Sequence, residues 1–218
     1  LDVPFSEPIM ARGNIEDWLN VLLQGMRKTM KDLCRLCAGE ILTGTGRNSN
    51  DDLRVFVDHE IAQFALLGIQ ILWTDLQETA LDESARNKKA LNDNAKFMAE
   101  LLRWLSSWCL QDLGSKNNRK KIETLVTVHV HQKDVSRHLK NLYSQGLLKL
   151  GKNDFEWLQQ ARFYWDPKGA DDCTDDGAMN IYVADWLATY QYEFLGAKER
   201  LVITPLTDRC YITLGQAL

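Results

Sequence analysis

A glycine-rich segment followed by a lysine is the most direct candidate for phosphate chemistry in this sequence. Gly146, Gly151 and Lys152 fit the spacing G-x-x-x-x-G-K, in which backbone amides and a lysine surround phosphate groups. Asn153 stands where such a loop needs a hydroxyl that binds magnesium, and leucines fill the space between the glycines. We therefore interpret the segment as a turn between two helices, with a small kinase built on it as an alternative.

Cysteine and histidine side chains could hold a metal, but their spacing argues against a metal site. Cys34 and Cys37 form C-x-x-C without the second pair that a zinc site needs, or the strand-to-helix context of a redox motif. His129 and His131 would point to different faces of a helix, and with His138 they form no His-Glu-x-x-His motif. We interpret the cysteines as apolar packing and the histidines as core or surface residues.

An acidic loop from Asp166 to Gly177 begins like a calcium-binding loop. If Asp172 were its first ligand, the closing bidentate glutamate would have to stand at Val183. The pattern therefore fails, and we interpret the segment as a solvated hairpin loop. The sequence as a whole predicts neither a metal site nor a catalytic residue.

The last stretch, from Arg200 to Leu218, combines an apolar run with a helix start. The run from Leu201 to Ile203 reads as a strand that ends at Pro205, because proline lacks a backbone donor. Thr207 and Asp208 then read as the N-cap and first-turn acid of a helix. An apolar loop against a helix start can hold a flat heterocycle, although spacing alone favours a loop packed into the core.

Composition describes an ordinary soluble chain of 218 residues, with 45% hydrophobic and 26% charged residues. That length allows one large domain or two small ones. The net charge of −4 excludes binding of nucleic acid by overall electrostatics. The sequence contains no run of 18 apolar residues, so it predicts no membrane span. It also shows no signal-peptide pattern. The five cysteines suit a reducing compartment, and a first residue other than methionine suggests part of a longer polypeptide.

Helical periodicity dominates the first 160 residues. Asn14 is the predicted N-cap of a helix whose apolar stripe runs from Ile15 to Ile41. After a loop from Thr43 to Asp52, a second helix is expected from about Val57 to Glu83, apolar on nearly every side between Ile61 and Trp73. Its expected core residues are Phe64, Leu67, Ile71 and Trp73.

Two further helices and a hairpin follow. Ser84 is the predicted N-cap of a third helix, whose apolar seam should pack nearly antiparallel on a neighbour; its positions are Leu91, Ala95, Met98, Leu102, Leu105 and Cys109. A fourth helix is expected from about Asn117 to Ser144, despite its β-branched middle. A short helix from Asp154 to Gln160 then leads to a strand from Arg162 to Trp165, which should pair with Ile181–Phe194.

Several segments resemble dynein heavy chains, in the order in which that family has them. Leu201–Leu214 is similar to the beginning of the first AAA+ module, especially in axonemal outer-arm heavy chains. The other segments are Pro4-Phe5 with Gly13–Leu19, Ala65–Gln70 with Leu72–Thr74, Glu123–Asp134, Asp154–Trp157 with Arg162–Tyr164, and Tyr192–Gly196. The resemblance therefore covers most of the chain.

The resemblance implies a mainly α fold with a small β component. It predicts an elongated bundle of long antiparallel helices, which is the family's linker, then a C-terminal β-hairpin and the opening strand and helix of an AAA+ α/β module. The implied division is a helical linker segment over residues 1–160, a β-hairpin junction over 161–196 and the start of the first AAA+ module over 197–218.

The resemblance also implies a function. The chain would be a fragment of the ATP-driven, microtubule-based motor of cilia and flagella, with a linker arm that transmits the power stroke from the first ATPase site. ATP or ADP with Mg²⁺ would be held mainly by residues beyond the chain, which lacks Walker A and Walker B motifs and should not hydrolyse ATP alone. The residues implied to contact adenine are Leu201, Val202, Thr204, Pro205 and Leu206.

Partners and location follow from the same resemblance. They are the AAA+ ring of the remaining heavy chain, microtubules through the parent protein, and other dynein subunits, with no nucleic acid and no membrane. The expected location is the axoneme and cytoskeleton, with the cytoplasm as the alternative. The competing function is a free-standing helical scaffold or interaction module with no nucleotide role.

Overall fold

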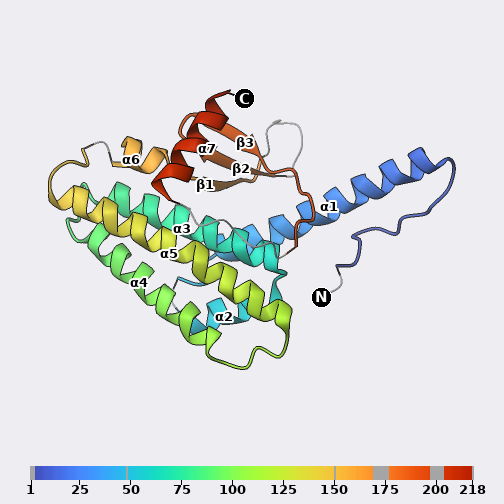
Figure 1. Ribbon diagram of the computed structural model, residues 1–218, viewed down its shortest axis with the longest axis horizontal. Coiled ribbons are helices and arrows are strands. Elements are labelled where there is room, and N and C mark those ends of the chain that lie inside the picture. Colours follow the sequence, from blue (N-terminus) through green and yellow to red (C-terminus); the bar gives the residue numbers. More distant parts are fainter. Residues whose placement is uncertain (1–2, 48, 150, 169–176, 197–203, 218) are drawn as a thin grey trace.

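The computed structural model describes residues 3–47, 49–149, 151–168, 177–196 and 204–217. Helices dominate these residues, and a small antiparallel sheet lies above them (Figure 1). The predicted mainly α class with a small β component is confirmed. In chain order the elements are α1 (Ile15–Leu42), α2 (Asn50–His59), α3 (Ala62–Glu83), α4 (Ala90–Cys109), α5 (Lys116–Ser144), the 3₁₀ helix η1 (Gly151–Asn153), α6 (Phe155–Leu158), β1 (Arg162–Asp166), β2 (Ala178–Val183), β3 (Trp186–Thr189) and α7 (Pro205–Ala217).

Helix α3 is the central element, because its first half, up to Trp73, is apolar on nearly every side. It packs against α1, α4, α5 and β1, so that the sheet and the other long helices all lie around it (Figure 1). The four side chains predicted to form the core are all buried, which confirms the prediction: Phe64, Leu67, Ile71 and Trp73.

The prediction of a single helix from about Val57 to Glu83 is wrong, because α2 and α3 are separate. Glu60 and Ile61 adopt extended backbone angles, with ψ of 147° and 153°. The buried ammonium group of Lys121 donates hydrogen bonds to the carbonyl oxygens of Val57 and Glu60, the latter at 3.1 Å. It thereby satisfies carbonyls that the end of α2 leaves without an intrahelical partner.

The predicted start of α1 is confirmed, because Asn14 occupies the N-cap position, although its side chain makes no capping hydrogen bond. The start of α2 differs from the prediction. Helix α2 begins inside the predicted Thr43–Asp52 loop, because the Ser49 hydroxyl accepts hydrogen bonds from the Asp51 and Asp52 amides at 3.1 and 3.4 Å.

The predicted N-cap of the third helix is wrong, because Ser84 is the C-cap of α3 and its hydroxyl donates to the Leu81 carbonyl at 2.7 Å. Helix α4 begins later, at Ala90. Its predicted seam is correct at Leu91, Met98 and Leu105, which are buried. The alternate buried positions are Asn94, Leu101 and Trp108, each one residue before the predicted Ala95, Leu102 and Cys109. Both patterns repeat every seven residues, so the sequence period alone could not separate them.

Helix α5 confirms the prediction of a fourth long helix through a β-branched middle. Its N-cap is Ser115, whose hydroxyl accepts from the Asn118 amide at 3.1 Å. Helices α4 and α5 lie side by side and run in opposite directions, as the seam predicts (Figure 1).

Cys34 and Cys37 lie on the buried face of α1 and confirm the packing interpretation. Burial raises the pKa of the Cys34 thiol to about 12. It raises the pKa of Cys37 as well, with a smaller contribution from the Glu60 carboxylate. Both thiols are therefore protonated at neutral pH, and the Cys37 Sγ donates to the Phe64 carbonyl at 3.3 Å.

The sheet has the order β1-β2-β3, and all its pairs are antiparallel. Phe163 pairs with Ile181, which confirms the predicted pairing of the first strand with the segment that starts at Ile181. The predicted continuous strand from Ile181 to Phe194 is wrong, because β2 ends at Val183 and a turn precedes β3. Ala184 in that turn has a φ of 50°, which an extended strand cannot accommodate.

Side chains of α3 attach the sheet to the helices. The Thr74 hydroxyl accepts a hydrogen bond from the Phe163 amide at 3.1 Å. The Glu78 carboxylate accepts from the Tyr164 hydroxyl and, at 3.1 Å, from the Trp157 indole. One acidic side chain of α3 thus holds both β1 and α6.

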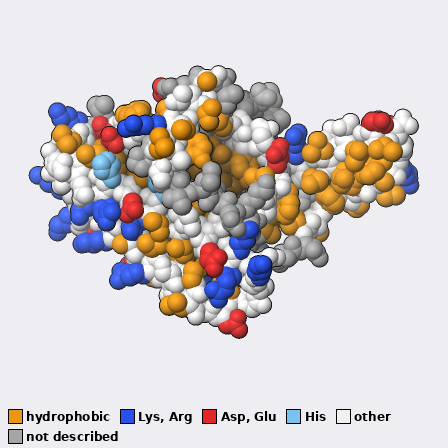
Figure 2. All heavy atoms as spheres, viewed as in Figure 1, with side chains coloured by type: hydrophobic (Ala, Val, Ile, Leu, Met, Phe, Trp, Pro, Cys, Tyr) orange, Lys and Arg blue, Asp and Glu red, His pale blue; other side chains and the backbone are white. Residues whose placement is uncertain are grey.

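The first half of α1 projects away from the rest of the molecule (Figure 1). The predicted apolar stripe is therefore buried only from Thr29 onward. Figure 2 shows apolar side chains gathered on the projecting part, and the exposed ones are Ile15, Leu19, Val21, Leu23 and Met26. In the part of the chain that the structure describes, no helix is long and apolar enough to cross a membrane.

Candidate functional site

The predicted adenine-side residues fall at the start of α7. Leu201 and Val202 lie outside the described residues. Pro205 is the first residue of α7, where its missing amide donor costs no hydrogen bond. Leu206 follows with 72% of its surface exposed, so the alternative of a loop packed into the core is wrong for this side chain.

Two threonines cap α7 reciprocally. The Thr207 hydroxyl accepts from the Thr204 amide at 2.8 Å, and the Thr204 hydroxyl accepts from the Thr207 amide at 3.3 Å. This is the geometry of a capping box, with Thr204 at the N-cap and Thr207 three residues later. The prediction of Thr207 as the N-cap is therefore wrong by three residues, because Pro205 is the first residue of the helix, whereas the sequence pattern placed it only at the end of a predicted strand.

Helix α7 rests on the sheet through a glycine. A Cβ added at Gly215 would lie only 3.1 Å from Cε3 of Trp186, so the missing side chain lets the helix backbone approach the indole ring. Trp186 is the first residue of β3, and α7 also contacts β2. Movement of α7 would therefore press directly on the sheet.

The residues from 190 to 196, which we call the connector, leave the sheet after β3 and pass the start of α3. Gln63 of α3 binds them with its side-chain amide. Its Nε2 donates to the Glu193 carbonyl at 2.8 Å, and its Oε1 accepts from the Leu195 amide at 2.8 Å. Nε2 also donates to the Tyr190 hydroxyl. A helical body and the chain leading to α7 are thus joined by hydrogen bonds.

The glycine-lysine segment lies between the helices α5 and α6, as predicted, and its Gly151 and Lys152 belong to η1. The ammonium group of Lys152 pairs with the Asp82 carboxylate at 3.0 Å, which raises the Lys152 pKa. This pair lines a cavity of about 430 Å³, whose other lining residues include Lys88, Lys149 and Tyr143. A phosphate group would have to compete there with the Asp82 carboxylate for Lys152.

His129 is a core residue, which agrees with the interpretation of this side chain. Its Nε2 lies 2.8 Å from the Met98 carbonyl and its Nδ1 lies 3.0 Å from the Gln132 amide oxygen. Burial lowers the pKa of His129, so the ring is neutral at physiological pH. Among the described residues, no three His, Cys, Asp or Glu side chains gather into a possible metal site. The calcium-like segment at Asp172 falls outside those residues.

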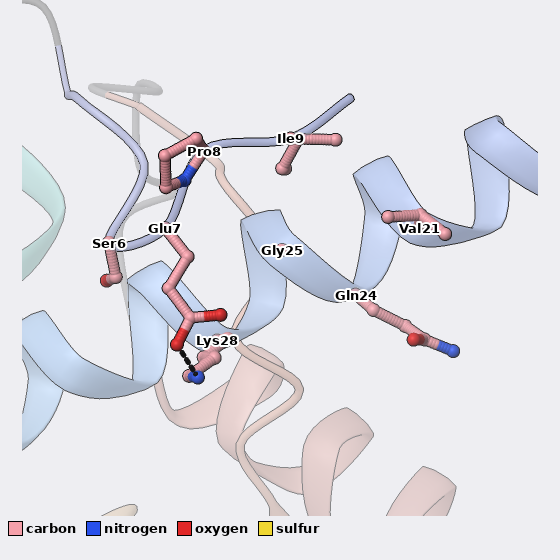
Figure 3. Close-up of a pocket in the computed structure, with 8 residues that line it drawn as sticks. All are labelled: Ser6, Glu7, Pro8, Ile9, Val21, Gln24, Gly25 and Lys28. Atoms are coloured by element: carbon pink, nitrogen blue, oxygen red, sulfur yellow. Dashed lines mark hydrogen bonds and ion pairs between the residues drawn. The ribbon is translucent and has the colours of Figure 1, made fainter. Parts of the chain in front are cut away.

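A small groove separates the N-terminal segment from α1 (Figure 3). Glu7 pairs with Lys28 at 2.6 Å, and Ile9 lies against Gly25, where an added Cβ would be 2.3 Å from Cδ1 of Ile9. The cavity of about 230 Å³ is lined by Ser6, Glu7, Pro8, Ile9, Val21, Gln24, Gly25 and Lys28. These contacts hold the segment on the helix, and they include no arrangement suited to catalysis.

Sequence reasoning missed Gln63, Gly215 and Glu78, which join the parts of the molecule. Gln63 is a polar residue in the part of α3 that is otherwise apolar on nearly every side, and this contrast is the signal that could have identified it. Glu78 lies in the more polar second half of α3 and carries no such signal. Gly215 carries the weaker signal of a glycine inside a helical pattern.

Comparison with known proteins connects these residues to one family. A family model described as the hydrolytic ATP binding site of dynein motor region matches residues 190–218. Dynein axonemal heavy chain 5 of Rattus norvegicus is 41% identical over 216 residues, which cover 99% of this chain and 6% of the rat protein. The flagellar outer-arm dynein gamma chain of Chlamydomonas reinhardtii is 39% identical over 216 residues, which cover 99% of this chain and 4% of the algal protein. Dynein axonemal heavy chain 8 of Homo sapiens is 41% identical over 211 residues, which cover 96% of this chain and 4% of the human protein.

The chain therefore spans 4–6% of the length of these relatives. Their axonemal and flagellar names confirm the predicted resemblance and indicate the axoneme of the cilium or flagellum as the location. The similarity runs through the helices, the sheet and the terminal helix alike. We conclude that this chain belongs to the family of axonemal dynein heavy chains.

Proposed function

We propose that this chain is the part of a dynein heavy chain in which the linker arm meets the first AAA+ module, and that it transmits the power stroke of an ATP-driven microtubule motor. The observation that carries the proposal is the match of the dynein ATP-site family model to residues 190–218. The same residues include the connector, which Gln63 binds, and Gly215, which lies against Trp186. The helical body is thus attached closely to the part of the chain that resembles a nucleotide module.

The contacts between the elements suit transmission of force. Helix α7 lies against Trp186, the Phe163 amide of β1 binds Thr74 of α3, and α3 packs against the other long helices. Packed interiors have low compressibility, so a displacement of one element moves its neighbours instead of compressing them. ATP binding to the ring would move α7 and the sheet, and the helical arm would follow.

We also propose that adenine lies against the start of α7, in contact with Leu201, Val202, Thr204, Pro205 and Leu206. Support comes from the exposure of Thr204 and Leu206 at the start of α7. The opposite end of this helix packs on the sheet through Gly215. ATP or ADP would gain apolar contact there. Its phosphates, the Mg²⁺ ion and the hydrolytic residues would belong mainly to other parts of the heavy chain. Microtubules and other dynein subunits would bind the whole motor.

The adenine proposal predicts that Leu206→Asp in the full-length heavy chain weakens ATP binding by about tenfold or more. Loss of a buried leucine contact is worth about 1.5–3 kcal/mol, and about 1.4 kcal/mol corresponds to tenfold. The measurement is the Kd of a fluorescent ATP analogue. Leu214→Asp is the matched control, because Leu214 is 60% exposed on the same helix, about 12 Å further along its axis. Equal affinities of the two variants would contradict the adenine assignment.

A further inference from the structure

The connector is held to the sheet before it reaches Gln63. The Tyr190 amide donates to the Met179 carbonyl at 3.0 Å, and the Met179 amide donates to the Tyr192 hydroxyl at 3.0 Å. The rings of Tyr190 and Tyr192 meet edge to face with their centroids 5.4 Å apart. The connector therefore starts from a fixed position on β2.

The connector then changes direction in an unfavourable backbone conformation. Tyr192 has a φ of 55°, in the left-handed region that a bulky side chain rarely adopts. Such a conformation persists only where surrounding contacts hold it. The Met179 hydrogen bond holds it from the side of the sheet, and the bonds of Gln63 to Glu193 and Leu195 hold the residues that follow.

Gln63 is suited to this role by its chemistry and its burial. A primary amide offers a donor and an acceptor, as a backbone peptide group does. Here the donor binds the Glu193 carbonyl and the acceptor binds the Leu195 amide. Only 6% of Gln63 is exposed, so water cannot readily replace the connector as its partner. An opening of this contact would leave a buried amide unsatisfied, which favours the closed arrangement.

We propose that Gln63 is a positioning residue that fixes the direction of the connector relative to α3, so that motion of the nucleotide module turns the helical body instead of bending the connector. This inference rests on the proposed function of the chain as a linker arm. It adds the specific side chain through which the arm and the connector move together.

The test compares Gln63→Met with Gln70→Met in the full-length heavy chain. Both glutamines lie on α3 and are similarly buried, 6% and 7% exposed, but the connector hydrogen bonds belong to Gln63. Methionine retains the length of the side chain and removes the amide. In Gln63→Met, amide hydrogen exchange at residues 190–196 should accelerate by about fivefold or more, since the amide makes three hydrogen bonds to the connector and even one of them contributes about 1 kcal/mol. Gln70→Met should leave this exchange unchanged.

The functional readout is microtubule gliding velocity divided by ATP turnover. Gln63→Met should lower this ratio by about threefold or more, while turnover stays within about twofold of wild type, because the proposed function places the hydrolytic residues mainly in other parts of the heavy chain. Unchanged exchange, an unchanged ratio, or equal losses of velocity and turnover would each overturn the proposal. If the helical arm of the wild-type heavy chain does not move when nucleotide binds, the proposed function is wrong. If the wild-type arm moves but the Gln63 and Gln70 variants behave alike, only the proposed role of Gln63 is wrong.

Discussion

Replacing Trp157 by alanine is expected to lower the free energy of unfolding of this chain by about 3–5 kcal/mol, the cost typical of deleting a buried large aromatic ring. The indole is fully buried and meets the Trp73 ring edge to face at 5.1 Å between centroids. Its N–H donates to Glu78 at 3.1 Å. Helix α6 is too short to be stable alone, so the buried Trp157 side chain anchors α6 on α3, beside the Lys152–Asp82 ion pair that joins η1 to α3.

Urea unfolding of the variant and wild-type chains measures this effect. Phe155→Ala is the matched control, because Phe155 lies in the same helix with 58% of its surface exposed. It should change the free energy of unfolding by less than about 0.5 kcal/mol. Trp157→Phe should give an intermediate loss, since it retains a ring and removes the donor to Glu78. A loss below about 1 kcal/mol for Trp157→Ala would contradict the anchoring role.

Gly68→Leu is expected to destabilise the chain by about 3 kcal/mol through overpacking of the core. A Cβ at this position of α3 would lie 2.6 Å from Cζ of Phe56 and 3.2 Å from Cγ1 of Ile41. Both neighbours are buried, so neither can move aside freely. The gain in helix propensity on replacing glycine is at most about 1 kcal/mol and cannot offset this clash.

Gly39→Leu provides the control for Gly68→Leu. Gly39 lies inside α1, where an added Cβ would meet nothing within 4 Å. The substitution should therefore leave the free energy of unfolding unchanged or raise it slightly. Removing the facing ring in the double variant Gly68→Leu/Phe56→Ala should relieve the clash. The double variant should therefore lose less free energy of unfolding than the sum of the two single variants, as a double-mutant cycle measures. Strict additivity, or equal tolerance of leucine at both glycines, would contradict close packing between α2 and α3.

The long helices could be predicted from sequence because a local pattern determines them. The apolar stripe of α1 and the length of α5 both follow from a period near 3.6 residues, even where the middle of α5 is β-branched. The burial of Phe64 and Trp73 could be predicted in the same way, because this part of α3 is apolar on nearly every side. The resemblance to dynein heavy chains, which rested on short ordered segments, was confirmed by relatives that match 96–99% of the chain.

The parts that sequence reasoning missed depend on contacts between residues far apart in the chain. The break between α2 and α3 at Glu60 is completed by Lys121, 61 residues away, and the connector is bound by Gln63, 130 residues from Glu193. Periodicity carries no information about such pairs. The error at the start of α7 had a local cause, because Pro205 can either end a strand or begin a helix. The division into residues 1–160, 161–196 and 197–218 stays a prediction.

Electron cryo-microscopy of the full-length heavy chain, with and without a non-hydrolysable ATP analogue, tests the central claim most directly. The account predicts that α3, α4, α5 and the sheet superpose between the two states to within about 1 Å, while this body changes its orientation relative to the AAA+ ring and α7 forms part of a nucleotide module. An unchanged orientation of the body in both states, or an α7 remote from every nucleotide, would contradict the account.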